Sequence, residues 1–306
     1  MPNWADILRE IQQFQGTHLA QANSAVDIVR KKYLKSLHDY TQRNIISYYS
    51  GFLSKPGVLQ SDINDEDKNG FMMATHKLDR KKGLDLILHT PGGDIAATQS
   101  IVNYLHKMYG HNIRAIIPQI AMSAGTMLAC TCNEIIMASH SNIGPIDPHL
   151  NGIPAFGVIE EFKRACKEVK KDPALIPVWQ SIVGQYRPTF LSRCENAIKW
   201  SNDFVQENLE QVMFEGMPDA KKKAKQIVKN LTDYTKNKTH NRHIHFEECE
   251  MGLRVIKLEK DDKLQDLVLT VHHCYMHALM NTPSYKMIEN HLGVALVKRE
   301  VVPPPK

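Results

Sequence analysis

The stretch from Gly83 to Gly110, GLDLILHTPGGDIAATQSIVNYLHKMYG, contains a complete strand, turn and helix. GLDLILHT is a short apolar run typical of a buried strand, and Pro-Gly-Gly stops it. AATQSIVNYLHKMY then carries its apolar residues at helical spacing, and Gly110 is a typical helix end. The spacing of apolar residues therefore changes from that of a strand to that of a helix across one glycine-rich turn.

The same alternation continues along the chain. NIRAIIPQIA (112–121) is typical of a strand, SAGTMLACTC (123–132) of a short helix, and NEIIMAS (133–139) of another strand. Short apolar strands that alternate with helices form a parallel sheet covered by those helices. We therefore predict an α/β fold, with functional groups at the turns that follow its strands.

Segments of helical character lie on both sides of this alternation. Residues 1–43 carry an amphipathic stripe and are expected to form an N-terminal helical arm. Residues 44–292 are expected to form a single core, since no internal repeat or low-complexity linker divides them. Residues 293–306, which end in VVPPPK, are expected to be a C-terminal tail.

The composition is that of a soluble globular protein, with 306 residues, 42% hydrophobic and 23% charged. The six cysteines form no CxxC pair, which favours reduced thiols and a cytoplasmic location. The first residues lack the apolar run of a signal peptide, and no run of about eighteen apolar residues predicts a transmembrane segment. We expect neither secretion nor a membrane span.

The net charge of +5 is mild and its basic residues are scattered. DAKKKAKQIVKN (219–230) is the most basic run, but no aromatic residue interleaves with its lysines. A solvated helix face explains it better than a nucleic-acid site, so we expect no nucleic-acid partner.

Two glycine-containing turns carry the residues suited to acyl transfer. Gly92 and Gly93 offer backbone that a substrate can approach closely, and Ser123 lies at a strand-to-helix turn between small residues. An acyl transferase needs a nucleophile and two N–H groups aimed at the oxyanion, which Ser123, the amide of Ala124 and the Pro-Gly-Gly turn would supply. Each turn taken alone also has an ordinary structural explanation, as a helix N-cap or a tight turn.

LILHTPGGDI, IPQIAMSAGTMLAC and NEIIMASHSNIGPIDPHL together resemble the Clp-fold serine proteases. Among these, the resemblance is closest to the serine dehydrogenase proteinase family, relatives of signal peptide peptidase A, and it runs from about Asn44 to about Leu292. It implies a ClpP/crotonase-like ββα spiral that assembles into homo-oligomers and cleaves peptide or protein substrates. It also implies that Ser123 is the nucleophile and that Gly92, Gly93 and Ala124 form the oxyanion hole.

The general base is open between a lysine and a histidine, because relatives use either a Ser-Lys dyad or a Ser-His-Asp triad. Lys163 and Lys170 flank the apolar face of a helix predicted over 158–171, and a lysine base must be partly desolvated. We favour Lys163, although lysines beside an apolar face often only extend toward water. The alternative is His149 in GPIDPHL, with Asp147 as its partner or as a residue that shapes the loop.

Histidines elsewhere raise the question of a metal. His240, His243 and His245 form one cluster and His273 and His277 another, but there is no HExxH or paired CxxC motif. Zinc needs three or four convergent ligands, so structural or interface roles are preferred and no metal is expected. No GxGxxG turn or pyridoxal-binding signature is present, and we expect no cofactor.

These patterns predict a serine peptidase that forms an acyl-enzyme on Ser123. Two alternatives remain open: a crotonase-like enzyme that uses the same oxyanion hole on acyl-CoA esters, and a catalytically weak oligomeric scaffold. Acyl-CoA turnover that survives Ser123→Ala would favour the first alternative. An intact oligomer without turnover would favour the second.

Overall fold

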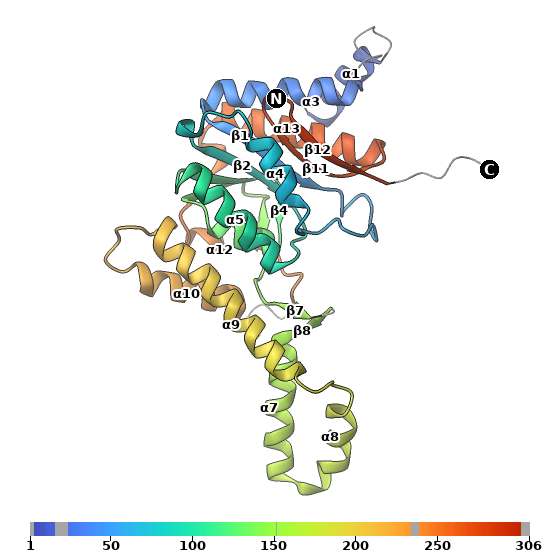
Figure 1. Ribbon diagram of the computed structural model, residues 1–306, viewed down its shortest axis with the longest axis vertical. Coiled ribbons are helices and arrows are strands. Elements are labelled where there is room, and N and C mark those ends of the chain that lie inside the picture. Colours follow the sequence, from blue (N-terminus) through green and yellow to red (C-terminus); the bar gives the residue numbers. More distant parts are fainter. Residues whose placement is uncertain (1–2, 16–23, 151, 234–238, 301–306) are drawn as a thin grey trace, which may run out of the picture.

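The computed structural model describes residues 3–15, 24–150, 152–233 and 239–300. These residues form a sheet-based core and a long helical protrusion that extends from one end of it (Figure 1). The expected α/β class, with a parallel-rich sheet covered by helices and a helical N-terminus, is confirmed.

A seven-stranded sheet forms the centre of the core, in the order β10-β5-β3-β2-β1-β11-β12. The first five of these pair in parallel, and β11 and β12 add to the β1 edge in antiparallel fashion. The strands are β1 (Asn44–Ser50), β2 (Leu84–His89), β3 (Ile113–Ile117), β5 (Glu134–Met137), β10 (Val255–Lys257), β11 (Ser284–Asn290) and β12 (Ala295–Arg299).

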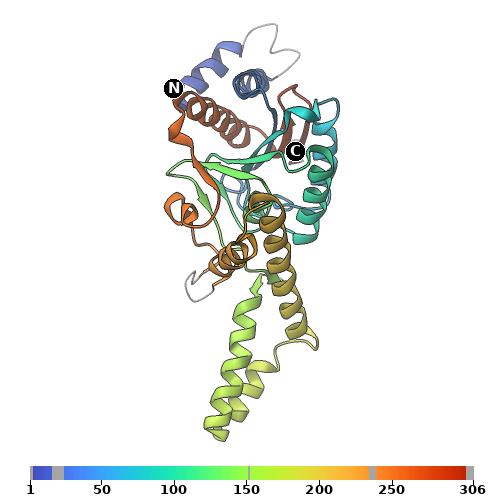
Figure 2. The same cartoon turned by 90° about the vertical axis from the view of Figure 1, so that its left-hand side faces the viewer.

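Helices cover both faces of this sheet (Figure 2). Because successive side chains of a strand point to opposite faces, Ile45 and Tyr49 of β1 join one apolar cluster while Ile46 and Tyr48 join the other. The first face is covered by α3 (Ala25–Thr41) and α13 (Asp262–Asn281), with α1 (Trp4–Phe14) packed outside them. The second face is covered by α4 (Asp67–Thr75), α5 (Ile95–Tyr109) and α6 (Ala124–Cys130).

A second, three-stranded sheet lies at the carboxyl ends of the main strands. It consists of β4 (Ile120–Ala121), β6 (Asn142–Ile143) and β9 (Ile244–His245), in that order. β4 and β6 are parallel, whereas β6 and β9 are antiparallel. The carboxyl ends of β4 and β6 therefore lie beside the residues that enter β9.

The protrusion begins with the hairpin of β7 (His149–Leu150) and β8 (Ile153–Pro154) and continues through α7 (Ala155–Lys171) and α8 (Ile176–Val183). It returns to the core along α9 (Phe190–Asn208). The two ends of α9 belong to different apolar clusters, since Phe190 packs in the protrusion and Phe204 in the main core. The protrusion thus has a small apolar cluster of its own.

The remaining elements lie between those already described. They are a π-helix (Leu209–Met213), α10 (Ala220–Thr232), α12 (Phe246–Glu250) and three short 3-10 turns (Arg80–Lys82, Pro173–Leu175 and Leu258–Lys260). In α10, Ala224, Ile227 and Val228 are buried and most of the lysines are exposed, as predicted for a solvated helix face. Among the described residues, no helix combines the length and apolar character needed to cross a bilayer.

The expected boundaries differ from the packing at the C-terminal side. β12 lies within 293–306, the segment expected to be a tail, yet it pairs with β11 from Ser284 to Glu289. A boundary at residue 292 would divide this hairpin, because the sheet continues to Arg299. Residues 301–306 lie outside the described residues. At the N-terminal side, the buried ion pair between Arg30 and Glu289, 2.6 Å, ties α3 to the core.

Candidate active site

Ser123 lies between β4 and α6 in an unusual backbone conformation, with φ 51° and ψ −116°. A positive φ is costly for a residue with a side chain and persists where the surroundings impose it. The serine side chain makes no capping hydrogen bond to α6. By contrast, Asp94 caps the neighbouring helix α5 through the amide of Ala97 at 2.8 Å. The hydroxyl of Ser123 is therefore not used as a helix cap.

The Pro-Gly-Gly turn packs directly against this serine. Gly92 has φ +101°, and a Cβ atom placed on it would lie 2.7 Å from both the Met122 carbonyl oxygen and the Ser123 Cβ. Backbone hydrogen bonds hold the two segments together, since Met122 N–H donates to the Thr90 carbonyl at 3.0 Å and Thr90 N–H to that of Ile120 at 3.2 Å. Only glycine fits at position 92 without displacing the serine.

The backbone amides near Ser123 differ in whether they donate a hydrogen bond. The Gly92 N–H donates to Thr90 Oγ1 at 3.1 Å. Ile63 flanks the turn on the other side, donating to the Gly92 carbonyl at 2.7 Å and accepting from the Asp94 N–H at 2.9 Å. In the described part of the chain, the N–H groups of Gly93 and Ala124 donate to no other group. These two amides are the donors available to a substrate oxygen.

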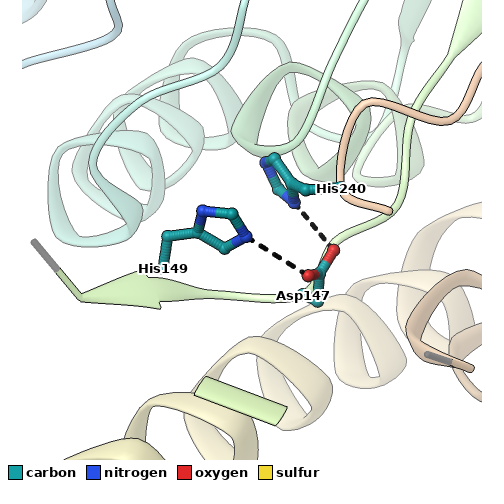
Figure 3. Close-up of side chains that lie close together, drawn as sticks. All are labelled: Asp147, His149 and His240. Carbon is teal, nitrogen blue, oxygen red and sulfur yellow. Dashed lines mark hydrogen bonds and ion pairs between the residues drawn. The ribbon is translucent and has the colours of Figure 1, made fainter. Parts of the chain in front are cut away.

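Asp147, His149 and His240 form a compact cluster on the segments that follow β6 and precede β9 (Figure 3). His240 Nδ1 lies 2.7 Å from Asp147 Oδ1, and His149 Nε2 lies 3.5 Å from Asp147 Oδ2. The two imidazole rings are 4.1 Å apart between centroids. The Asp147 side chain is 5% exposed, that of His240 21% and that of His149 29%. A buried carboxylate is thus shared by two partly accessible histidines.

The register of β6 and β9 explains why residues so far apart in sequence meet. Ile143 pairs with Ile244 and Asn142 with His245 in the antiparallel ladder. Continued beyond the ladder, the same register brings Asp147 opposite His240. Two further hydrogen bonds hold the segment before Asp147, from the Ile146 N–H to the Leu231 carbonyl at 3.2 Å and from Ser201 Oγ to the Ile146 carbonyl at 2.8 Å.

The electrostatics of the cluster keep Asp147 ionised. Burial alone raises the pKa of a carboxyl group, because it disfavours the charged form. The hydrogen bond from His240 and the charges of His149 and His240 outweigh this effect and hold the pKa of Asp147 well below its usual range. An ionised aspartate at the Nδ1 side of a histidine fixes the ring and leaves Nε2 able to accept a proton.

The cluster and Ser123 lie at the same end of the small sheet. β4 pairs with β6 so that Ala121 is opposite Ile143. Gly144 then packs on Met122, where an added Cβ atom would lie 2.5 Å from Met122 Cε and 3.4 Å from its Cα. The segment that carries Asp147 thus starts beside the residue that precedes Ser123.

The structure places Lys163 elsewhere. α7 projects away from the sheet (Figure 1), and the Lys163 side chain is 68% exposed and paired with Glu160 at 2.8 Å. Lys170 is also exposed, in the last turn of the same helix. A lysine must lose much of its hydration to act as a base near neutral pH, and no residue that the structure describes shields Lys163 from water.

Of the histidines weighed as metal ligands, only His240 joins such a cluster within the described residues. His243 and His245 are exposed, and His277 packs on Trp4 with ring centroids 4.0 Å apart. The sequence pattern suggested a fold role for His240. Its pairing with Asp147 was not foreseen.

The fold and the geometry at the strand ends define a ClpP-like α/β protein with a serine-centred site. More narrowly, the chain belongs to the family of ClpP-like SDH-type serine proteinases, whose family model matches residues 28–290. The resemblance recognised in the sequence is thereby confirmed.

Two uncharacterized proteins of Methanocaldococcus jannaschii are similar in sequence. One is 30% identical over 214 residues, which cover 70% of this chain and 65% of that protein. The other is 33% identical over 173 residues, 56% of this chain and 52% of that protein. The chain therefore spans between about half and two thirds of the length of these curated relatives.

Among solved structures, a membrane-bound stomatin-specific protease in complex with a substrate peptide is similar at a TM-score of 0.40 and 16% identity. The match covers 66% of this chain and 73% of that chain.

Proposed function

We propose that this chain is a serine peptidase that hydrolyses peptide bonds through an acyl-enzyme on Ser123. The observation that carries the proposal is the contact between the two turns. Gly92 touches Ser123, the serine hydroxyl is not a helix cap, and the amides of Gly93 and Ala124 beside it have no acceptor. These are the groups that acyl transfer requires in one place.

The reaction follows from this arrangement. Ser123 Oγ attacks the substrate carbonyl carbon while its proton passes to the base, and the resulting oxyanion accepts hydrogen bonds from the Gly93 and Ala124 amides. The base then gives this proton to the departing amine, the C–N bond breaks, and an ester to Ser123 remains. Water attacks the ester in the same way and releases the acid, with the proton returned to Ser123.

We assign His240 as the base and Asp147 as the residue that orients it. His240 faces Asp147 through Nδ1 at hydrogen-bond distance, which leaves Nε2 for the serine proton. His149 approaches Asp147 through Nε2 at 3.5 Å, which is too long for a strong hydrogen bond. His149, Lys163 and Lys170 are the alternatives, and the experiments below separate His240 from His149 and Lys163.

Labelling with a fluorophosphonate probe tests the nucleophile. The wild-type chain and Ser181→Ala, which changes an exposed serine of α8, are expected to be labelled, and Ser123→Ala is not. Equal labelling of wild type and Ser123→Ala would overturn the assignment. Acyl-CoA turnover that persists in Ser123→Ala would instead favour a crotonase-like enzyme, and an intact oligomer without labelling would favour a scaffold.

Labelling rates also test the base. A general base contributes about 10²–10⁴-fold, so His240→Ala is expected to slow labelling by at least about 10²-fold. His149→Ala and Lys163→Ala are expected to retain rates within about tenfold of wild type. If His149→Ala or Lys163→Ala alone shows the large loss, that residue is the base.

The substrate class and assembly are part of the same proposal. The family of serine proteinases acts on peptides, and we expect a peptide or protein substrate and a homo-oligomer. Light scattering on the purified chain measures the assembly, and a monomer at all concentrations would contradict it.

A further inference from the structure

Asp147, His149 and His240 offer three metal-binding atoms in one place (Figure 3). One carboxylate oxygen and two imidazole nitrogens lie within 4.8 Å of one another. We propose that this cluster binds a zinc ion and that the bound ion reversibly inhibits the enzyme. The inhibition rests on the proposed function, whereas the binding of zinc does not.

The separations of these atoms suit zinc. Zn²⁺ is bound by histidine nitrogen and aspartate oxygen at about 2.0–2.2 Å, so the ligand atoms of a tetrahedral site lie about 3.3 Å apart. His240 Nδ1 lies 2.7 Å from Oδ1 of Asp147 and His149 Nε2 lies 3.5 Å from its Oδ2, and one ligand atom from each of the three residues lies within 4.8 Å of the others. Rotations of the two histidine rings would be enough to close the site around an ion.

An unsatisfied oxygen provides a second observation. The Asp147 side chain is 5% exposed, and its Oδ2 makes no hydrogen bond with the described residues. Buried carboxylate oxygens are normally hydrogen-bonded, and leaving one without a partner is costly. Oδ2 lies on the side of His149 and would be neutralised by a cation held between the two side chains.

The ligand set selects the kind of ion. Mg²⁺ and Ca²⁺ prefer oxygen ligands throughout, whereas two imidazoles and one carboxylate are typical of zinc. Three protein ligands leave a fourth position open to water. The partial exposure of His149 and His240, 29% and 21%, gives an ion a route from solvent.

Inhibition follows from the chemistry of imidazole. A neutral imidazole has one nitrogen with a lone pair and one that carries a proton. Once zinc occupies the lone pair, the other nitrogen bears the proton and cannot accept one from Ser123. This holds whether His240 binds the ion through Nδ1 or through Nε2, so the zinc-bound form has no base.

Calorimetry tests the binding independently of activity. Zinc chloride is titrated into the chelator-treated full chain carrying Ser123→Ala, which cannot form an acyl-enzyme. We expect one zinc per chain, loss of binding when His149→Ala or Asp147→Asn is added, and no change with His243→Ala, which alters a nearby exposed histidine. The proposal is overturned if no stoichiometric binding occurs or if binding survives His149→Ala in a chain with wild-type circular dichroism.

The labelling rate tests the inhibition. One equivalent of zinc is expected to slow fluorophosphonate labelling of the wild-type chain by about 10²-fold or more, and EDTA to restore it. His149→Ala, compared with its own metal-free rate, is expected to be insensitive to the same zinc concentration. Stoichiometric zinc that leaves the wild-type rate unchanged would overturn the inhibition. A chain that is never labelled contradicts the proposed function, while calorimetry still decides whether zinc binds.

Discussion

Two lysines, one in the core and one in the protrusion, show how differently the two regions treat a charge. Lys286 of β11 is 1% exposed and contacts both carboxylate oxygens of Asp67, at 2.9 and 3.0 Å. Lys163 of α7 is 68% exposed and pairs with Glu160, itself 57% exposed. Of these two lysines, only Lys286 is shielded from water and held by a buried partner, which is what a catalytic site needs of its polar groups.

Lys286 also supports the Pro-Gly-Gly turn. Lys286 Nζ donates to the Asp62 carbonyl as well as to Asp67. The residue that follows Asp62 is Ile63, which hydrogen-bonds on both sides of Gly93. The ion pair therefore holds the strand segment against which the Pro-Gly-Gly turn is fixed.

The largest expected effect is that of breaking the buried pair. Lys286→Met leaves the buried Asp67 with only the more distant Lys298, 3.9 Å away, and removing one partner of a buried pair costs about 3–5 kcal/mol. We expect the free energy of unfolding, measured in urea, to fall by that amount. The matched change in the protrusion, Lys163→Met, is expected to alter it by less than about 0.5 kcal/mol. Equal effects in the two regions would contradict the comparison.

The next largest effect is expected from adding a methyl group to the Pro-Gly-Gly turn, and it concerns catalysis. Gly92→Ala forces a side chain onto φ +101° and onto Ser123 at 2.7 Å, so one amide donor or the serine must move. Loss of a donor typically costs about 10²–10³-fold in kcat. The control is Gly152→Ala between β7 and β8, which also has a positive φ, +78°, but no atom within 4 Å. Similar losses of labelling rate in both variants would count against the assigned hole.

Acid is expected to weaken the core and not the protrusion. Burial lowers the pKa of His89 to about 3 and that of His272 well below its usual value, while residues 152–200 contain no histidine. The unfolded chain binds these protons near pH 6.5, so this stability is complete above that pH and is lost as the pH falls toward 3.

The expected loss for His89 between pH 7.5 and pH 5 is about 2 kcal/mol. Urea unfolding at the two pH values measures it, with His89→Phe as the comparison. The variant is expected to lose less stability than the wild type over this range. Identical losses would show that the protonation of His89 does not destabilise the fold.

The smallest expected effect concerns the lysine favoured from the sequence. Lys163→Met is expected to leave the labelling rate within about twofold of wild type, because an exposed ion pair contributes at most about 1 kcal/mol. A large loss would show that Lys163 reaches a serine in an assembled form of the protein, and would make a Ser-Lys dyad the preferred assignment.

The parts of the fold and of the site that depend on residues close together in the sequence could be predicted. The strand, turn and helix of 83–110 follow from local periodicity and glycine positions. That Gly92 meets Ser123 also follows, because adjacent parallel strands bring their carboxyl ends to one edge. The contact between Gly92 and Ser123 could not be stated from the sequence alone, because the spacing of the two turns along the chain does not establish that their strands are adjacent.

The pair of Asp147 and His240 could not be predicted in the same way. The two residues are 93 positions apart, and their meeting depends on β6 and β9, which have two residues each. Strands this short have no measurable periodicity. The position of Lys163 could not be predicted for a related reason: the apolar stripe of its helix packs within the protrusion and not on the core.

The continuity of α9 gives the protrusion a mechanical connection to the site. A helix of 19 residues is about 28 Å long and bends little. Near its core end, Ser201 Oγ donates to the Ile146 carbonyl at 2.8 Å, one residue before Asp147. That hydrogen bond connects the core end of the helix to the backbone beside Asp147. A load on the far end of the protrusion is therefore transmitted along α9 to the contacts at its core end, among them this hydrogen bond beside Asp147.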